Sequence, residues 1–535
     1  MKRRILVLFV MALVLLFSFA KQTNATEVPA QGEDSAYTLT EVSSPSGNNV
    51  ITRYEYNAET GDVTAKYYRL DLKKTEYGTG ENSTTVNTNV VNSTVPVTVK
   101  YDDASTKTYD NNYTAPVINS GDTTITNAIF NNISSTTEMI TAFKNTETGN
   151  VERLNADFIN NSVVLNEKGI GIEFLIKNRG TIGDINANFV NNRIESQVST
   201  GYGLGIEGGF FVSNSASSSS NASIGNINGN FINNSIVLNS TSHGHATVSG
   251  SFFIGNYSFS NVVRIGDVSS NFIGNNVDIY ASAQTALYGA GYIGNRSNGV
   301  IGNITGDFIN NNMTLRATNY SSTLAGAGFI GNYAFNNDET KIGNINSNFI
   351  NNTVTVSSST AALYGGGIIG NYNYYNTISD KKVSIGNING DFINNKITVS
   401  GKAMVLGGTL IGNYAYNCKY DTIIGDITGD FINNSVEISG YSSSVRTTGL
   451  IGNFSSYGSD GNSVAKIGKI NANFYNNNVT TNGQWAMGGA ITNYNTRGFG
   501  NYSVIDSISG EFIKNGLRNT YSSTSSYALG GAIYS

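Results

Sequence analysis

The architecture of this chain depends on residues 224–234, Ile-Gly-Asn-Ile-Asn-Gly-Asn-Phe-Ile-Asn-Asn. The motif at its end, Phe-x-x-Asn preceded by Asn, Asp or Glu, occurs ten times, with its phenylalanines at Phe158, Phe189, Phe231, Phe272, Phe308, Phe349, Phe392, Phe431, Phe474 and Phe512. Successive copies are 31, 42, 41, 36, 41, 43, 39, 43 and 38 residues apart, and a weaker copy lies at Phe130. A recurring period near 39 residues indicates a repeat protein.

A second motif follows most of these copies after about twenty residues, as in Gly326-Ala-Gly-Phe-Ile-Gly-Asn332. Its other copies occupy residues 289–295, 365–371, 407–413, 488–493 and 530–534. Both halves of the repeat contain short runs of Ile, Val, Phe and Tyr between Gly, Asn and Ser, without a helical period of 3.6 residues. We therefore predict strands, with each half of the repeat forming one coil.

The predicted fold is all-β: a parallel β-helix, or solenoid, of about ten double-coil repeats of ~40 residues. In such a fold each coil pairs its backbone with the coils above and below, so equivalent side chains stack. Phe and Ile would fill an apolar column, and Asn at a corner would adopt the left-handed conformation and hydrogen-bond the next Asn in a ladder. About twenty coils at ~4.8 Å each predict a body on the order of 100 Å long.

Other repeat architectures fit the sequence less well. WD40 propellers share the period but carry Gly-His and Trp-Asp signatures, whereas this chain has two His and one Trp. Helical HEAT and armadillo repeats need helix-forming residues, and leucine-rich repeats need a Leu framework that Ile and Phe do not supply here. The solenoid is the prediction that remains.

Composition excludes several functional classes. Only 13% of the 535 residues are charged, the net charge is -5, and 39% are hydrophobic. Charge-driven disorder and long charged helices are therefore disfavoured. A pI near 5.3 without a Lys/Arg cluster in the mature chain also disfavours nucleic acid as a partner.

The first 25 residues have the features of a secretory signal peptide. Lys2, Arg3 and Arg4 precede an apolar run over residues 5–20, and small residues at 23–25 offer a cleavage site. An uncleaved membrane anchor is the alternative, although sixteen residues span a ~30 Å hydrocarbon core poorly. The mature protein is expected to begin near Thr26 and to be exported.

Two further regions follow the signal peptide. All four prolines precede residue 117, which places a boundary near residue 120 between a leader region, 26–120, and the repeat domain, 121–535. In the leader, strand-like runs at 50–56 and 63–70 flank a Gly-containing turn and predict a β-hairpin. Residues 78–120 suit either short strands or the first coils of the array.

The alternation of the two motifs resembles the paired Phe-x-x-Asn and Gly-Gly-Ala-Ile tetrapeptides of the chlamydial polymorphic membrane proteins, and more broadly autotransporter passenger domains. Gly-Gly-Ala-Ile is complete at residues 488–491 and 530–533. The resemblance covers about residues 120–535 and implies a right-handed β-helix displayed at the cell surface or outer membrane, commonly for adhesion. Such proteins end in a membrane β-barrel, whereas this chain stops inside a repeat, so we expect either a fragment or a separate anchoring chain.

Candidate catalytic and metal-binding residues have simpler structural explanations. Acids recur at Asp184, Asp267, Asp307, Asp391, Asp426 and Asp430, in positions that Asn occupies in other copies. A catalytic carboxylate pair would be singular, so we predict turn and corner roles. His243 and His245 lack a third metal ligand nearby. We therefore expect no catalytic residues, no metal site and no cofactor.

The single cysteine and a set of recurring tyrosines each allow two interpretations, one structural and one functional. Cys418, the only cysteine, is either a small buried or loop hydrophobe or a reactive residue. Tyrosines recur just after Gly-Asn at Tyr333, Tyr372, Tyr374, Tyr375, Tyr414 and Tyr416. They would either stack within the solenoid or form an exposed face that contacts sugars or proteins.

The sequence therefore predicts a secreted or surface-displayed, non-enzymatic repeat protein. Weak contacts along a repetitive face would give avidity for host or neighbouring cell-surface glycans or proteins, as in an adhesin. Two alternatives stay open: a β-helix enzyme that degrades polysaccharides, and a structural protein that associates with itself. The sequence identifies no ligand-binding residue.

Overall fold

The computed structural model describes residues 37–44, 50–56, 63–72, 81–82, 97–100, 106–138, 140–166, 174–198, 204–216, 221–241, 245–258, 261–335, 339–375, 382–419, 421–439, 447–456, 464–483, 485–496, 502–520, 527–529 and 531–535. The predicted signal peptide, residues 1–25, lies outside this part of the chain. The chain divides into two compact units, Met1–Lys73 and Lys74–Ser535.

The first unit contains a three-stranded antiparallel sheet. Strands β2 (Val50–Tyr56) and β3 (Val63–Leu72) pair as the predicted hairpin, with Val50 opposite Arg69 and Tyr56 opposite Val63. The sequence analysis did not predict the third strand, β1 (Tyr37–Val42), which pairs with the other edge of β3.

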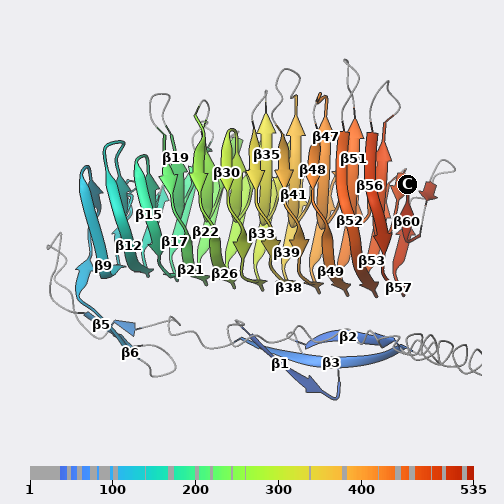
Figure 1. Ribbon diagram of the computed structural model, residues 1–535, viewed down its shortest axis with the longest axis horizontal. Coiled ribbons are helices and arrows are strands. Elements are labelled where there is room, and N and C mark those ends of the chain that lie inside the picture. Colours follow the sequence, from blue (N-terminus) through green and yellow to red (C-terminus); the bar gives the residue numbers. More distant parts are fainter. Residues whose placement is uncertain are drawn as a thin grey trace, which may run out of the picture. The chain divides into compact units, whose positions relative to one another are not determined.

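The second unit begins with short strands and continues as a stack of coils. Strands β4 (Glu81–Asn82), β5 (Val97–Lys100) and β6 (Thr106–Tyr109) form a small antiparallel sheet. Parallel stacking starts at β7 (Asn111–Tyr113), slightly before the boundary expected near residue 120. Figure 1 shows the coils that follow side by side along one axis.

One coil contains six short strands. In the middle of the stack these are β36 (Thr340–Ile342), β37 (Ile345–Asn346), β38 (Phe349–Ile350), β39 (Thr353–Ser357), β40 (Thr360–Gly365) and β41 (Ile369–Tyr374). Each pairs in parallel with the equivalent strand of the next coil, so that Phe349 lies opposite Phe392 and Asn371 opposite Asn413. The parallel β-helix predicted from the sequence is confirmed.

The number of coils per repeat differs from the prediction. Each ~40-residue repeat makes one coil, because both motifs stack on their own copies one full repeat away. The two motifs thus occupy different sides of the same coil. A sheet of 11 strands at ~4.8 Å spacing gives a stack of about 50 Å, half the predicted length.

Four sets of paired strands run the length or part of the length of the stack. The 11-stranded sheet comprises β10 (Ser134–Ser135), β13 (Ser162–Asn166), β17 (Arg193–Val198), β22 (Ser235–Ser240), β27 (Asn276–Ala281), β33 (Asn312–Ala317), β39, β45 (Lys396–Ser400), β50 (Ser435–Ser439), β53 (Asn478–Asn482) and β58 (Gly516–Asn519). The strands that carry Ile-Gly-Asn belong to a 12-stranded sheet, and six strands form a shorter one. Strands equivalent to β36–β38 make up the remaining side of the coils.

Phenylalanine fills the interior in one continuous column. Phe130 and the ten motif phenylalanines stack with neighbouring ring centroids 4.4–5.1 Å apart. The weaker copy of the motif at Phe130 therefore belongs to the repeat array. All are fully buried except Phe512 in the last coil. Burial of a large apolar ring in every coil is the main stabilising contribution of the motif.

The two asparagines of Phe-x-Asn-Asn have separate roles. The first adopts a left-handed backbone, with φ of 56° at Asn351 and 54° at Asn394. The second is buried and forms a ladder in which Asn352 Nδ2 donates to Asn395 Oδ1 at 3.0 Å and to the Phe308 carbonyl at 2.7 Å. The predicted left-handed corner and the predicted ladder are therefore carried by neighbouring residues.

Ile-Gly-Asn builds a second ladder on the other side of each coil. Asn371 Nδ2 donates to Asn413 Oδ1 at 3.0 Å, and the same contact joins Asn332 to Asn371. The preceding glycine is required by close approach, since a Cβ on Gly370 would lie 1.9 Å from the Gly326 carbonyl oxygen. These ladders satisfy buried polar groups at the corners and fix the register of the coils.

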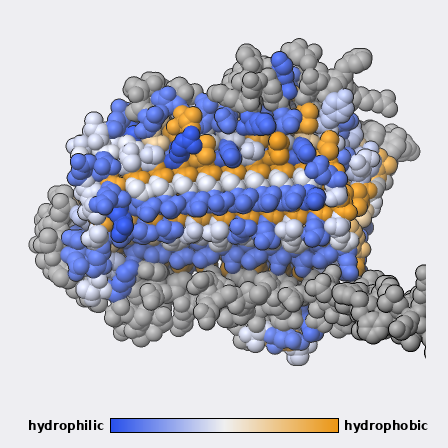
Figure 2. Space-filling view, viewed as in Figure 1, coloured by the Kyte–Doolittle hydropathy of each residue, from blue (hydrophilic) through white to orange (hydrophobic). Residues whose placement is uncertain are grey.

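Residues of one kind therefore form stripes along the stack (Figure 2). Bands of hydrophilic and hydrophobic residues run parallel to the axis because each position repeats once per coil. Among the residues described, no helix is long and apolar enough to span a lipid bilayer.

Candidate functional site: a tyrosine groove

Two sheets meet at a concave corner on the outside of the solenoid. The shorter sheet comprises β18 (Leu204–Gly209), β23 (His245–Ser251), β28 (Gln284–Ala290), β34 (Ser321–Ala327), β40 and β46 (Met404–Gly407). The 12-stranded sheet comprises β8 (Val117–Asn119), β11 (Phe143–Asn145), β14 (Ile176–Asn178), β19 (Val212–Ser215), β24 (Ile254–Tyr257), β29 (Ile293–Arg296), β35 (Ile330–Phe335), β41, β47 (Ile411–Tyr416), β51 (Ile451–Ser456), β55 (Ile491–Asn495) and β60 (Ile533–Tyr534). Outward side chains of both sheets face each other across this corner.

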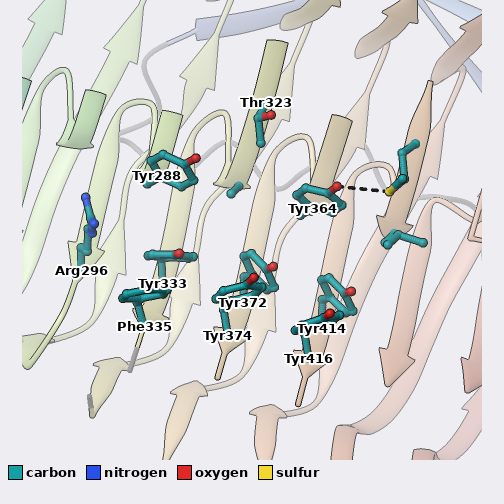
Figure 3. A pocket seen from close by; sticks show the side chains of 13 residues that line it. Tyr288, Arg296, Thr323, Tyr333, Phe335, Tyr364, Tyr372, Tyr374, Tyr414 and Tyr416 are labelled. Carbon is teal, nitrogen blue, oxygen red and sulfur yellow. Dashed lines mark hydrogen bonds between the residues drawn. The ribbon is translucent and has the colours of Figure 1, made fainter. Parts of the chain in front are cut away.

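The corner contains a cavity of about 610 Å³, which we call the tyrosine groove. Its lining residues are Tyr288, Arg296, Thr323, Ala325, Tyr333, Phe335, Tyr364, Tyr372, Tyr374, Met404, Leu406, Tyr414 and Tyr416 (Figure 3). This volume is typical of small-molecule sites. No acidic residue is present among these described lining residues.

One wall of the tyrosine groove is a column of aromatic rings. Tyr333, Tyr372 and Tyr414 occupy the same register position in β35, β41 and β47. Their ring centroids are 5.3 Å and 4.8 Å apart, and the Tyr372 and Tyr414 rings are parallel within 2°. Two residues further on, Phe335, Tyr374 and Tyr416 form a second stack, with centroids 5.6 Å and 5.0 Å apart.

The opposite wall has an aromatic ring only in alternate coils. Tyr288 lies opposite Ala325 in the register, and Ala325 lies opposite Tyr364 in the next coil. Figure 3 shows Tyr288 and Tyr364 on the same side, separated by the strand that carries Thr323. Tyr288 and Tyr364 thus flank a place that Ala325 leaves without a ring.

Burial separates the tyrosines that the sequence analysis grouped together. Tyr333, Tyr372 and Tyr414 are buried, with 4%, 5% and 2% of their surfaces exposed, so for these three the first of the two interpretations, stacking on one another in the solenoid, is confirmed over an exposed face. Stacking within the column covers their faces. Tyr374 and Tyr416 are half-buried in the second stack, and Tyr375 is 40% exposed.

Tyr375 also has an unusual backbone. Its φ is 59°, the left-handed region, and the next coil has Asn417, with φ of 50°, at the equivalent position. A tyrosine in this conformation costs roughly 1–2 kcal/mol. Its ring meets those of Tyr374 and Tyr416 edge-on at 4.6 Å and 5.5 Å, which extends the aromatic surface at the rim.

Three hydroxyl groups of the tyrosine groove, those of Tyr364, Tyr372 and Tyr414, stay neutral. Burial raises the pKa of Tyr372 and of Tyr414 well above the ordinary value, and desolvation also raises the pKa of Tyr364. Tyr414 Oη shares a hydrogen bond of 3.0 Å with Ser456 Oγ, and Tyr364 Oη donates to Met404 Sδ at 3.1 Å. The walls therefore present apolar ring edges and neutral hydroxyl groups.

Arg296 is the one charged residue among the described lining residues. It replaces tyrosine in the aromatic column, with Tyr257 opposite it in the preceding coil and Tyr333 in the following coil. Its guanidinium carbon lies 5.5, 5.8 and 5.6 Å from the ring centroids of Tyr257, Tyr288 and Tyr333. These are cation–π distances. The sequence analysis did not single out Arg296 or Ala325, because only the register shows which copies they interrupt.

The recurrent acids lie in ladders away from the tyrosine groove. Asp307, Asp391 and Asp430 share one ladder with asparagines, and Asp307 Oδ1 accepts from the backbone and side chain of Asn348 at 3.0 Å. Asp184, Asp267 and Asp426 belong to a second, exposed ladder in which backbone N–H groups of the next coil donate to the carboxylates. Asp267, Asp307, Asp391 and Asp426 lie between strands, as the predicted turn and corner roles require, whereas Asp184 and Asp430 lie within β15 (Thr181–Asn186) and β49 (Ile427–Ile432).

The remaining candidates do not form a reactive site. Cys418 is buried, with Sγ 3.1 Å from the Tyr416 carbonyl oxygen and 3.3 Å from that of Asn373, as in the first of its two interpretations. His245 is exposed at the start of β23, and His243 lies outside the described residues. Within the described part of the chain, no group of three or more His, Cys, Asp or Glu residues could hold a metal ion.

Three comparisons of this chain with known proteins found no match. A scan against protein-family models found no match to the chain. Searches of curated proteins and of solved structures found none either.

Proposed function

We propose that the protein is exported and acts at the cell surface as a non-enzymatic adhesin, the passenger of an autotransporter-like system. It would bind glycans or proteins of host or neighbouring cells. The resemblance of its two motifs to autotransporter passengers supports the location. The tyrosine groove supports the binding role.

The tyrosine groove is the observation that carries this proposal. It is an open, mostly apolar cavity with a few hydroxyl groups, which is the usual chemistry of a binding site. Tyrosine offers a large contact area and a polar tip at low entropic cost. The recurrent carboxylates accept ladder hydrogen bonds elsewhere, which favours binding over polysaccharide cleavage at the groove.

Binding to cultured cells and to immobilised glycans tests the proposal. Removal of the half-buried rings in the double variant Tyr374→Ala/Tyr416→Ala is expected to weaken binding at least about 10-fold, because stacked aromatic rings dominate such contacts. Tyr280→Ala is the matched control, since Tyr280 is also half-buried but lies on the 11-stranded sheet, where Oη bonds Thr318 Oγ1. Equal binding by both variants and the parent, or release of reducing sugar ends from the glycans, would overturn the proposal.

A further inference from the structure

Arg296 lacks the partners that a guanidinium normally has. Its Nε and Nη1 atoms are buried without a hydrogen-bond partner among the described residues, and no described carboxylate pairs with it. By contrast, Arg316 pairs with Asp278 at 2.7 Å, and Arg193 pairs with Glu195. The rings around Arg296 compensate its charge only in part, since a cation–π contact is weaker than a charge-assisted hydrogen bond.

The position of Arg296 makes this charge available to a ligand. It lies at one end of the tyrosine groove, beside Tyr288 and Tyr333 (Figure 3). With Nε and Nη1 buried, Nη2 is the guanidinium nitrogen left accessible. An unpaired cation at the end of a neutral cavity favours a ligand with an anionic group at the matching end.

The rest of the tyrosine groove favours a sugar over a peptide. A peptide commonly adds as a strand to an exposed sheet edge. Here β34, β35, β40 and β41 each pair with neighbours on both sides, so these walls have no free edge. Ring edges with hydroxyl groups of Tyr288, Tyr374 and Tyr416, by contrast, match the alternating C–H and hydroxyl groups of a saccharide.

We infer that the tyrosine groove binds an acidic oligosaccharide, with a carboxylate on the Arg296 guanidinium and an adjacent sugar ring in the space between Tyr288 and Tyr364. Ala325 puts no ring between Tyr288 and Tyr364, because it stands where the coils on either side have these two tyrosines. Its own side chain is buried in one cluster with Tyr333 and Tyr372, so the sugar ring would contact the flanking tyrosines and not Ala325. This inference rests on the proposed function and specifies the ligand class of the same site.

Calorimetric titration of the purified protein with two hexasaccharides tests the inference. The acidic probe is a hyaluronan hexasaccharide, which carries glucuronate carboxylates, and the neutral probe is chitohexaose. Arg296→Gln is expected to weaken binding of the acidic probe about 10- to 100-fold, the loss of one charge-assisted interaction, and to leave the neutral probe unchanged. Arg316→Gln is the matched control and is expected to change neither.

A second variant tests the position of the sugar ring. Ala325→Tyr fills the space between Tyr288 and Tyr364 and is expected to abolish binding of the hyaluronan probe while Arg296 remains. Thermal unfolding of each variant shows whether the solenoid is intact. If Ala325→Tyr does not fold, Ala325→Leu provides the same obstruction with a smaller side chain.

The outcomes separate this inference from the proposed function. Equal affinity for both hexasaccharides, or an Arg296→Gln variant that binds hyaluronan as the parent does, would overturn the acidic ligand and leave a neutral glycan site. A hexamer of glutamate that binds more tightly than hyaluronan would replace the sugar by an acidic peptide. If neither hexasaccharide binds the parent protein and the parent protein also does not bind cells, the proposed adhesin function itself would be overturned.

Discussion

At the scale of single residues, the ladder asparagine is the most constrained position in the repeat. Asn352 Oδ1 accepts from both the backbone and the side chain of Asn311 at 3.0 Å, while Nδ2 donates to Phe308 and Asn395. No other side chain of this size combines an NH2 group with two donors and a separate carbonyl acceptor. This explains why the final Asn of Phe-x-x-Asn is present in all ten copies.

Asn352→Ala is expected to destabilise the solenoid by about 2–4 kcal/mol, because it removes the side-chain donor to the Phe308 carbonyl and leaves the Asn311 backbone N–H buried without its acceptor. Asn351→Gly is the matched control. It keeps the left-handed backbone, as Gly274 does with φ of 65°, and is expected to change the stability by only a few tenths of a kcal/mol. Urea unfolding of both variants measures the difference, and similar midpoints would contradict the separate roles of the two asparagines.

Asp307 illustrates the cost of a charge in an asparagine ladder. Burial raises the pKa of its carboxyl above the ordinary value, so the folded state holds a proton more tightly than the unfolded state. Its contribution to stability is therefore most favourable below the unfolded pKa and falls as pH rises through the folded pKa.

Asp307→Asn is expected to stabilise the protein by about 1 kcal/mol at pH 7, because Asn at this position can still accept from Asn348 and removes the buried charge. The gain is expected to shrink as pH falls toward 4, where the parent carboxyl becomes protonated. Urea unfolding of parent and variant at pH 7 and pH 4.5 measures this, and a gain that grows with acidity would refute the assignment.

At the scale of the element, the stability of one coil depends on its neighbours. Phe349 is fully buried between Phe308 and Phe392, with centroids 4.8 Å and 4.9 Å away. Phe512 is only half-buried and stacks on Phe474 alone among the described rings. The same residue type therefore makes two contacts in the middle of the stack and one in the last coil.

Phe349→Ala is expected to cost about 3–5 kcal/mol, the usual loss for a buried ring that leaves a cavity. Phe512→Ala, the matched control at the last coil, is expected to cost less than half as much. Thermal unfolding and limited proteolysis of the two variants measure the difference. Equal losses would show that the phenylalanine column does not carry the stability of the interior coils.

The elements also show how far sequence reasoning reaches. Motif spacing predicted strands, stacking and ladders, because backbone pairing between equivalent positions is sufficient to require them. It did not predict how many sides a coil has, since that depends on where corners such as Asn351 and Gly370 turn the chain in space. The tyrosine groove was predicted only in part. The spacing picked out tyrosines of one wall, but Arg296 and Ala325 were missed, because their roles depend on Tyr333 and Tyr364 at the same position in neighbouring coils.

At the scale of the whole molecule, the solenoid is a linear array whose coils contact only the coils next to them. Stability is then approximately a sum of coil terms and interface terms. Removal of one complete coil should leave two ends that match in register. Thr340 lies opposite Val383 one coil later, so residues 340–382 constitute one such unit.

Deletion of residues 340–382 is expected to give a folded protein, because Val383 then takes the place of Thr340 and Phe392 stacks on Phe308. Scattering in solution should show a stack shorter by one strand spacing, ~4.8 Å, with an unchanged β-sheet circular dichroism spectrum.

Deletion of residues 340–359 is the control. It removes about half a coil and places β40 where β36 belongs. Tyr372 would then take the position of Asn352 and interrupt the asparagine ladder, so we expect aggregation or loss of cooperative unfolding. A double-coil repeat would tolerate that shorter deletion equally well, so a folded 340–359 variant would contradict the single coil per repeat.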